Sequence, residues 1–203
     1  MTDYIQGWIY KWGTYYEKPN LDMMLCVLKT YGKCGGVMID VGANIGNHSI
    51  YFTYRNIFRQ IIAYEAIEST YKILTTNVKI NRFTTKIDCR NKGVGSHNGY
   101  ALINKMDDNN IGGTSITHGN GDIEVITLDY EMIEDVSFLK VDVEGFECEV
   151  IKGALQTIER YNPVLMVEIH EADTMNTEYI INLLNDRGYQ YMRLDEINYL
   201  FFK

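Results

Sequence analysis

Glycine and acidic residues follow two apolar runs of this sequence at the spacing of a nucleoside-binding site. Asp40 comes directly after the apolar run 37–39, and Gly42 and Gly46 lie in the turn that follows. Glycines let the backbone approach a ligand closely, and the start of the next helix offers unpaired N–H groups to a negative group. Glu65 ends the second apolar run, 19 residues after Gly46, where a carboxylate can accept two hydrogen bonds from ribose hydroxyls. The spacing therefore predicts a pocket for a nucleoside-containing ligand.

The spacing of the glycines distinguishes between two kinds of nucleoside ligand. A dinucleotide-binding turn has the pattern G-x-G-x-x-G, which cradles a pyrophosphate. This chain has D-x-G-x-x-x-G, and the acidic Asp40 would repel a pyrophosphate but suits an ammonium. The turn from Asp40 to Gly46 resembles the first motif of the class I S-adenosylmethionine (SAM)-dependent methyltransferases, whose ligand ends in an amino acid. An ordinary tight turn between a strand and a helix is the alternative explanation of the same residues.

The predicted cofactor-binding residues lie in this turn, at the ends of further strands and in the loops that follow them. Ile67 can cover one face of an adenine, and the loop 91–95 can reach the adenine edge. The full set is Asp40, Gly42, Ala43, Asn44, Gly46, Asn47, Ser49, Glu65, Ala66, Ile67, Asn91, Gly93 and Asp142.

Ionisable residues also gather where two later apolar runs end. The carboxyl ends of parallel strands meet in one crevice, so we expect these side chains to converge and to act in catalysis. They are Lys140, Asp142, Glu144, Glu168 and His170. His170 is the natural general base near neutral pH, and Asp142 or Glu144 can orient it, bind neighbouring hydroxyls or serve as the base instead. A capping or core role is the alternative for His170.

The same carboxylates can bind Mg²⁺ or Mn²⁺, since both ions take oxygen ligands. Nothing in their spacing requires a divalent ion, so the prediction is a site without metal, and a divalent ion is kept as the alternative. Glu147 and Glu149 belong to the next helix, where we expect them on its solvated side or in its first turn, close to the positive end of the helix dipole.

Alternating strands and helices must position these residues, which predicts a mostly parallel sheet with helices on both faces. Core strands are expected at 37–39, 60–64, 86–90, 137–141 and 163–167, followed by 189–194 and an antiparallel last strand at 198–202. Helices are expected at 49–59, 69–81, 146–161 and 177–187, with a short helical link at 129–135. Strands at 99–104 and 122–128 flank the polar segment 105–121, a candidate lid over the substrate.

Residues 1–36 form a predicted helical extension, and 37–203 form the α/β core of the same single domain. The extension contains the aromatic residues Trp8, Trp12, Tyr15 and Tyr16. These rings can stack on a sugar, but apolar stripes at helical spacing usually pack against protein, and packing is the prediction here. The same rings are a candidate contact in a homodimer. A second helix is expected at 21–31.

Composition limits the classes of function. The chain has 203 residues, of which 23% are charged and 46% belong to the AVILMFWYC set, as in one globular domain. A formal charge of −8 argues against DNA or RNA as a partner, since such binding relies on Lys and Arg. Four cysteines without a C-x-x-C pair predict buried, reduced thiols in a cytoplasmic protein. The sequence shows neither a signal peptide nor an apolar run of the roughly 18 residues that span a membrane.

Four stretches together resemble the FkbM family of SAM-dependent methyltransferases. They are IDVGANIGNHS at 39–49, YEAIESTYKILTTNVKIN at 64–81, FLKVDVEGFECEVIKGA at 138–154 and PVLMVEIH at 163–170, in the order of the family. The block K-V-D-V-E-G-F-E is the most specific of these. At Tyr64-Glu65-Ala66 the family usually has F-E-P, so we expect a looser loop here with the ribose ligand kept.

The resemblance implies a class I methyltransferase Rossmann-like fold with seven strands, SAM as the methyl donor and an oxygen as the acceptor. The implied acceptor is a hydroxyl of a sugar or glycan, with a polyketide or another small molecule as the alternative. A D/N-P-P-Y block does not follow the fourth strand, which points away from nucleobase amines. A non-catalytic SAM-binding subunit and an NAD-dependent oxidoreductase are two further interpretations. Asp142 and His170 argue against the first, and the glycine spacing argues against the second.

Overall fold

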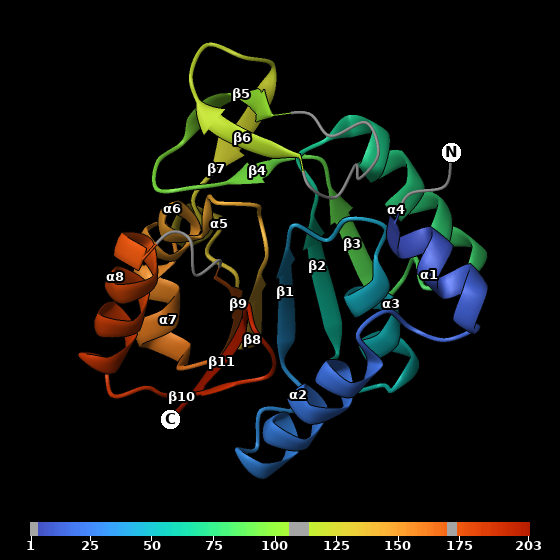
Figure 1. Ribbon diagram of the computed structural model, residues 1–203, viewed down its shortest axis with the longest axis horizontal. Coiled ribbons are helices and arrows are strands. Elements are labelled where there is room, and N and C mark those ends of the chain that lie inside the picture. Colours follow the sequence, from blue (N-terminus) through green and yellow to red (C-terminus); the bar gives the residue numbers. More distant parts are fainter. Residues whose placement is uncertain (1–3, 106–113, 170–173) are drawn as a thin grey trace.

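A computed structural model of the chain describes residues 4–105, 114–169 and 174–203. Its centre is a seven-stranded sheet with helices on both faces, and a four-stranded sheet lies beyond one end of it (Figure 1). None of the helices in these ranges combines the length and the apolar character needed to cross a membrane. His170 and residues 106–113 of the candidate lid lie outside the described residues.

The main sheet has the strand order β10-β11-β9-β8-β1-β2-β3. Its strands are β1 (Val37–Val41), β2 (Gln60–Tyr64), β3 (Ile87–Arg90), β8 (Val136–Val141), β9 (Val164–Glu168), β10 (Gln190–Arg193) and β11 (Asn198–Phe202). Strand β11 runs antiparallel to both of its neighbours, and the pairs from β9 to β3 are all parallel. This arrangement confirms the predicted fold class. Because β8 pairs with β1, Lys140 lies directly beside Asp40.

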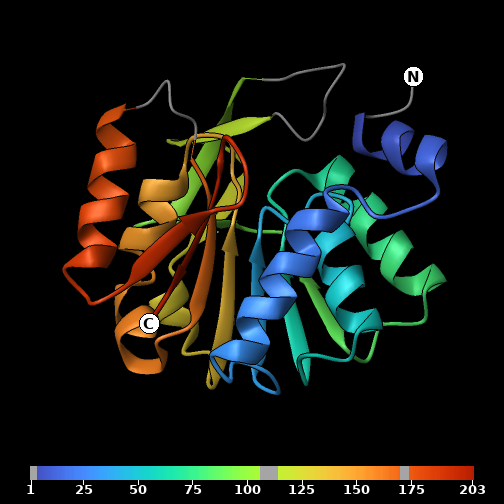
Figure 2. The same cartoon turned by 60° about the horizontal axis from the view of Figure 1, so that its bottom comes forward.

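Helices cover the two faces of this sheet in separate groups (Figure 2). One face carries α2 (Lys18–Thr30), α3 (Asn47–Tyr54) and α4 (Glu68–Ile80), and the other α6 (Glu147–Lys152), α7 (Leu155–Tyr161) and α8 (Thr174–Asn185). Side chains alternate between the faces along a strand, so Met38 packs with the first group and Ile39 with the second. Strand β1 is buried along its whole length, as a parallel strand covered on both sides should be.

The second sheet contains two strands that the sequence did not predict. Its order is β4-β7-β5-β6, with β4 (Gly93–Val94), β5 (Gly99–Lys105), β6 (Ser115–His118) and β7 (Ile123–Ile126). The predicted strands near β5 and β7 are confirmed. Strand β4 is too short to show a periodicity, and β6 belongs to the segment predicted to be a lid. The polar β6 is a strand because it pairs antiparallel with β5, which its own residues do not reveal.

The predicted helix 146–161 is wrong as a single element, because the chain breaks at Gly153 into α6 and α7. A Cβ on Gly153 would lie 1.9 Å from the carbonyl oxygen of Gly95, so glycine is needed for this close approach. The helix predicted at 49–59 begins at Asn47 and ends at Tyr54. The predicted helical link is α5 (Leu128–Glu131), shorter than expected.

The N-terminal extension consists of α1 (Tyr4–Trp12) and α2. Helix α2 buries Leu21, Met24, Val27 and Leu28 against the sheet, whereas α1 buries no side chain. Tyr15 packs on the core, as predicted, but the prediction of packing is wrong for Trp12, which is 59% exposed. The rings of Tyr4 and Trp8 lie 6.0 and 5.7 Å from that of Tyr16, and the ring of Tyr15 lies 5.2 Å from that of Tyr51.

All four cysteines are free thiols. Cys148 is buried and Cys89 is half-buried, but Cys26 and Cys34 are exposed. The prediction of buried thiols is therefore wrong for these two. Cys26 lies on the outer side of the amphipathic α2, and Cys34 lies in the turn that leads into β1.

Candidate functional site

The turn after β1 is fixed by the strands on both sides of it. Gly42 has a φ of +73°, and a Cβ there would lie 1.8 Å from the carbonyl oxygen of Asp142. The backbone N–H groups of Gly42 and Ala43 donate to the carbonyl oxygen of Tyr64 at 3.0 and 2.9 Å. Only glycine allows this backbone conformation and this approach at once.

A buried lysine joins the turn to two acidic residues. Lys140 Nζ donates to the carbonyl oxygen of Gly42 at 2.6 Å and lies 3.3 Å from Asp40 Oδ1 and 3.1 Å from Asp142 Oδ2. The contact with Gly42 is a hydrogen bond, and the contacts with the two carboxylates are ion pairs. Burial alone would lower the pKa of Lys140, but the carboxylates of Asp142 and Asp40 outweigh burial and raise it. Lys140, predicted to be catalytic, is therefore charged and fully engaged at neutral pH.

Glu65 lies at the end of β2 with both carboxylate oxygens bonded to the backbone. Oε2 accepts the N–H of Asn44 and Oε1 that of Ile67, each at 2.9 Å. Burial raises the pKa of Glu65 to about 7, although the two backbone bonds oppose the rise. Asn91 Nδ2 donates to the carbonyl oxygens of Glu65 and Ala66 at 2.8 and 3.1 Å, which braces the loop. Each Glu65 oxygen keeps a second lone pair that can accept from a ligand hydroxyl.

A cavity of about 340 Å³ lies over the carboxyl ends of these strands. Its size is that of a site for a small molecule or cofactor. Most of the predicted site residues line it, from both the cofactor and the catalytic sets. These are Gly42, Ala43, Asn44, Asn47, Glu65, Ala66, Ile67, Gly93, Lys140, Asp142, Glu144 and Glu168.

Four predicted cofactor residues, Asp40, Gly46, Ser49 and Asn91, do not line the cavity and instead support its walls. Asp40 is fully buried, and its Oδ2 accepts a hydrogen bond from Ser49 Oγ at 2.6 Å. Gly46 is the N-cap of α3, with a φ of +91°. The position of His170 relative to the cavity is not described.

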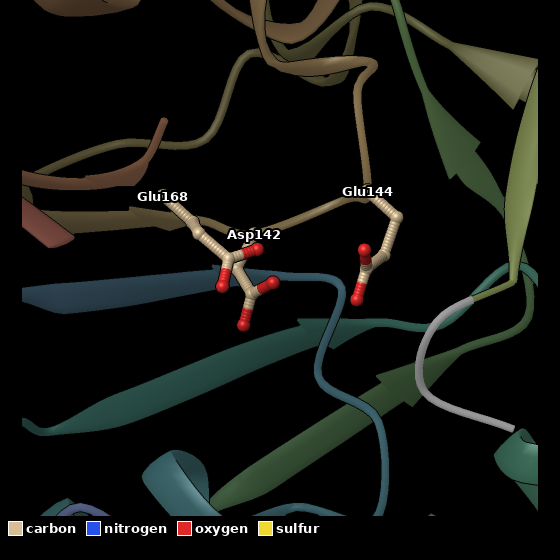
Figure 3. Close-up of side chains that lie close together, drawn as sticks. All are labelled: Asp142, Glu144 and Glu168. Atoms are coloured by element: carbon tan, nitrogen blue, oxygen red, sulfur yellow. The ribbon is translucent and has the colours of Figure 1, made fainter. Parts of the chain in front are cut away.

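The three carboxyl groups predicted at the strand ends come together in the cavity. Figure 3 shows the carboxyl groups of Asp142 and Glu168 next to each other, with that of Glu144 beside them. Each residue offers an oxygen within 4.8 Å of the other two, and within the described part of the chain this is the group of acids that could hold a metal ion. Glu144 has a φ of +54°, in the left-handed region.

Glu147 holds the loop that carries these acids. Its Oε1 accepts the N–H groups of Val143 and Gly145, both at 3.1 Å. Glu147 lies in the first turn of α6, as predicted, but it is buried, so the expectation of a solvated residue is wrong for it. The two loop N–H groups turn its carboxylate inward, which the helix pattern alone does not reveal.

A hydrogen bond joins the carboxyl groups of Asp142 and Glu168. Burial opposes the charge of Asp142, but Lys140 and a hydrogen bond from Glu168 lower its pKa. Burial and the Asp142 carboxylate raise the pKa of Glu168 well above its usual range. Two carboxyl groups in such contact do not both ionise, and the one nearer the lysine loses its proton first. The cavity therefore presents an ionised Asp142 and a neutral Glu168 at pH 7.

The segment before α2 contributes a further carboxyl group to the cavity. Asn47 Oδ1 accepts the N–H of Tyr16, and Asn47 Nδ2 donates to the carbonyl oxygen of Tyr16, both at 3.0 Å. This clamp fixes the next residue, Glu17, whose φ of +52° is unfavourable for a residue with a side chain. Glu17 lines the cavity, and burial, together with the charge of Asp142, raises its pKa to about 7.

His48, in the first turn of α3, also lines the cavity. Only 8% of the residue is exposed, and its Nε2 has no hydrogen-bond partner among the described residues. Burial and the charge of Lys140 lower the pKa of His48 to about 4, so the ring is neutral at pH 7. Buried polar atoms are normally paired, so the unpaired nitrogen makes His48 a candidate for contact with a ligand.

Tyr16, Glu17 and His48 were not among the predicted site residues. His48 lies directly after the glycine turn, and its place in the first helical turn is a signal that could have included it. Nothing in the local sequence marks Glu17, because its neighbours in the cavity, Lys140 and Asp142, lie far along the chain.

Residues 40–191 match the family profile described as Methyltransferase FkbM domain. The hexuronic acid methyltransferase AglP of Haloferax volcanii is 33% identical over 141 residues, which are 66% of this chain and 56% of that protein. The match thus spans little more than half the length of this curated relative.

Several solved structures share the fold. The methyltransferase FkbM from Methylobacillus flagellatus KT has a TM-score of 0.60 at 21% identity and covers 83% of this chain and 44% of that one. An rRNA methylase from Streptococcus thermophilus has a TM-score of 0.53 at 14% identity, covering 92% and 96% of the two chains. Precorrin 8W decarboxylase from Methanobacterium thermoautotrophicum has a TM-score of 0.52 at 12% identity, and the match covers 89% of each chain. These names denote different reactions, so the shared fold does not by itself identify the reaction.

Proposed function

Because this chain belongs to the methyltransferase FkbM domain family, we propose that it transfers a methyl group from SAM to a hydroxyl oxygen of a sugar or glycan. The observation that carries the proposal is that the family match, residues 40–191, contains the strand ends on both sides of the cavity. It includes Glu65 at one side and the Asp142–Glu168 pair at the other. A relative named for a hexuronic acid supports a carbohydrate acceptor.

The residues around the glycine turn fit SAM. The space beside Gly42 would be filled by any Cβ, and Asn44 Oδ1 is a buried acceptor without a partner among the described residues. Asn44 Oδ1 can accept from the ammonium of the amino acid end, and Glu65 from the ribose hydroxyls. Ile67 and Gly93 would border the adenine. When bound, SAM supplies an electrophilic methyl group on its sulfonium.

The chain's own task is then to orient an acceptor hydroxyl and to take its proton. A hydroxyl held in line at near-attack distance needs little further help except a proton acceptor. Among the residues that the structure describes, the ionised Asp142 is the candidate for the proton acceptor. Lys140 keeps Asp142 charged, and a hydrogen bond from Glu168 holds its carboxylate in place. His170 stays a prediction for the same role. The other product, S-adenosylhomocysteine, would leave from the same pocket.

Two alternatives lie within the reach of the same experiment. A polyketide or another small molecule can present the hydroxyl, and a non-catalytic SAM-binding subunit would show binding without transfer. RNA is a weaker candidate, since a chain with a formal charge of −8 attracts few phosphates.

The test is transfer of an isotopically labelled methyl group from SAM to sugars, glycans, polyketides and RNA, read by mass spectrometry. We expect label in a carbohydrate, and S-adenosylhomocysteine should raise the melting temperature of the protein. Asp142→Asn should lower the transfer rate by about 100-fold or more with little change in S-adenosylhomocysteine affinity. Asp186→Asn, an exposed change at the end of α8, is the matched control. Absence of S-adenosylhomocysteine binding, or label in RNA alone, would overturn the proposal.

A further inference from the structure

The cavity has a second half, away from the predicted nucleoside pocket. We infer that an acceptor subsite lies there, between Glu17, His48 and the Asp142–Glu168 pair, and that it prefers a neutral or amino-bearing sugar over one with a carboxylate. This inference rests on the proposed function, and it assigns a chemical class to the acceptor.

Strand order separates the two halves. Glu65 ends β2, on one side of β1, whereas Asp142 follows β8 and Glu168 ends β9, on the other side. Glu17 belongs to the second half, because its carboxyl group interacts electrostatically with Asp195, which precedes β11, and the adjacent Tyr16 interacts with Glu168. His48 lies near Glu17, since it follows Asn47, whose side chain holds the backbone of Tyr16. A methyl donor that fills the Glu65 half therefore leaves the Glu17 half to the acceptor.

The charges in this half disfavour an anion. Among the described residues that line it, the acids are Glu17, Asp142, Glu144 and Glu168, and the bases are His48 and Lys140. Lys140 is already engaged, because its ammonium donates to the carbonyl oxygen of Gly42 and forms ion pairs with both Asp40 and Asp142.

Lys92, the other cation among the described lining residues, lies close to the nucleoside half. It is adjacent to Gly93, and its Nζ lies 2.8 Å from Glu124 Oε1. No arginine is among the described residues that line the cavity. A carboxylate on the acceptor would thus meet Glu144 and the ionised fraction of Glu17, while Lys140 and Lys92 are already paired with carboxylates of the protein. Such like-charge contacts disfavour an anionic ligand.

Polar atoms for a hydroxylated ligand are nevertheless present. His48 lines the cavity, and its Nε2 is buried and has no partner among the described residues. A neutral imidazole nitrogen can accept from a hydroxyl or donate to it, depending on the tautomer, and a carboxylate accepts from hydroxyl or ammonium groups. A pKa of about 7 lets Glu17 take either protonation state near neutral pH, which suits a ligand with several hydroxyls.

The Asn47 clamp on Tyr16 explains how the N-terminal extension takes part. It ties the backbone directly before Glu17 to the first turn of α3, which also carries His48. Asn47 and His48, which follow the glycine turn, therefore help to position the part of the cavity that would contact the acceptor.

The test is a binding comparison with the full-length protein, saturated with S-adenosylhomocysteine in the presence of EDTA. The probes are methyl glucoside, methyl glucosaminide and methyl glucuronide, with saturation-transfer NMR and calorimetry as readouts. We expect the glucoside and the glucosaminide to bind at least about 100-fold more tightly than the glucuronide. Glu17→Gln should reduce this discrimination about tenfold, and Glu17→Lys should reverse it. His48→Leu should weaken binding of all three probes about tenfold, through the lost hydrogen bond.

The matched control is Glu134→Gln, which makes the same chemical change at an exposed residue just before β8, at the end of the strand away from the cavity. It should leave all three affinities unchanged. Equal binding of glucuronide and glucoside, tighter glucuronide binding, or no binding of any probe would overturn the inference. If S-adenosylhomocysteine binds while one of these results is obtained, the acceptor assignment fails and the proposed methyltransferase survives. If S-adenosylhomocysteine does not bind, the proposed function itself fails.

Discussion

The two halves of the cavity differ in how their carboxyl groups are held. On the nucleoside side, Glu65 is bonded by two backbone N–H groups that lie close to it in the fold. On the acceptor side, Asp142 and Glu168 are held mainly by each other and by Lys140. We call the first arrangement the cradle, because backbone N–H groups hold the Glu65 carboxylate in place. The second depends on the charges of Lys140 and Asp142 and on the proton between Asp142 and Glu168.

This difference predicts different weaknesses. A cradle made of backbone fails when its shape changes, so glycine and loop substitutions should affect it most. A balance of charges fails when a charge or a proton is removed, so it should respond to pH and to isosteric changes. Lys140 is the residue that belongs to both halves, because it binds the Gly42 carbonyl oxygen and the Asp142 carboxylate.

The largest effect should therefore come from Lys140→Met, which breaks both halves at once. Removing the ammonium leaves the buried Asp40 and the half-buried Asp142 without a counter-charge, and breaking a buried pair typically costs about 3–5 kcal/mol. We expect a loss of this size in the free energy of unfolding, measured in urea at pH 7, together with loss of S-adenosylhomocysteine binding. Lys152→Met removes an exposed lysine paired with Glu149 and should cost about 1 kcal/mol or less. Equal losses in the two variants would contradict the central role of Lys140.

Gly42→Ala should break the cradle first. The alanine Cβ would meet the carbonyl oxygen of Asp142 at 1.8 Å, in a conformation with φ of +73°. The strained backbone alone costs about 1–3 kcal/mol, and the clash must displace the turn as well. We expect no detectable S-adenosylhomocysteine binding by calorimetry and a lower melting temperature. Gly99→Ala is the control, because a Cβ there meets nothing closer than 4.0 Å. Normal cofactor binding by Gly42→Ala would mean that the turn is not the cofactor cradle.

The same contrast explains how much the sequence could predict. The cradle is local: strand, turn and helix start follow one another between Val37 and Asn47, so spacing alone locates it. The strand ends that carry Asp142 and Glu168 could also be predicted, because parallel strands place their carboxyl ends on one edge. The ionisation state of Asp142 could not be predicted from the sequence. Its low pKa depends on its distances to Lys140 and Glu168, which are set only when the sheet is packed.

Other features depend on contacts between segments that are distant in sequence. Glu17 reaches the cavity because Asn47 holds the backbone of Tyr16, 31 residues away in the chain. The break at Gly153 depends on the carbonyl of Gly95, and strand β6 on its pairing with β5. Periodicity within a segment contains no information about such partners, so the helix boundary and the second sheet were predicted incompletely.

Glu65→Gln should weaken the cradle without destroying it. Glutamine offers one acceptor oxygen and one amide donor, so either the Asn44 or the Ile67 N–H loses its partner. An unsatisfied buried group costs about 1–3 kcal/mol, so we expect S-adenosylhomocysteine affinity to fall about 10- to 100-fold in calorimetry.

The pH dependence of this binding sharpens the test. Burial raises the pKa of Glu65 to about 7 in the free protein, so the carboxyl is largely protonated at pH 6 and ionised at pH 8. Ribose hydroxyls donate to the ionised form, so affinity should rise with pH across this range and then level off. The Glu65→Gln variant should lack this rise. A rise of the same size in the variant would show that another group causes it.

Glu17→Gln should have a smaller effect on the free energy of unfolding, and this effect should depend on pH. Burial and the charge of Asp142 raise the pKa of Glu17 from 4.5 to about 7 in the folded protein, and Asp195 adds to the rise while Lys140 and a hydrogen bond with Tyr16 oppose it. Glu17 has a pKa of 4.5 in the unfolded chain and about 7 in the folded protein, so folding favours its protonated form. Its contribution to stability is complete below pH 4.5 and is lost as the pH increases through 7.

Stability in urea should therefore be about equal for Glu17→Gln and wild type at pH 5, and the variant should be the more stable protein at pH 8. Glu134→Gln, an exposed change, should follow wild type at both values. A variant that is less stable at pH 8 would mean that the Glu17 charge is favourable in the fold, contrary to its burial beside Asp142.

Removal of divalent ions should have the smallest effect, since we expect the methyl transfer rate to stay the same without them. The carboxylate oxygens of Asp142, Glu144 and Glu168 lie within 4.8 Å of one another, which is close enough for a metal ion. However, Lys140 already neutralises Asp142, and the proton between Asp142 and Glu168 already neutralises Glu168. A metal ion would have to displace that proton and compete with a buried ammonium, so we expect EDTA and added Mg²⁺ to leave the methyl transfer rate unchanged. Activity that is lost in EDTA and restored by Mg²⁺ would make the acceptor side cationic, and its preference should then shift from neutral sugars toward uronic acids.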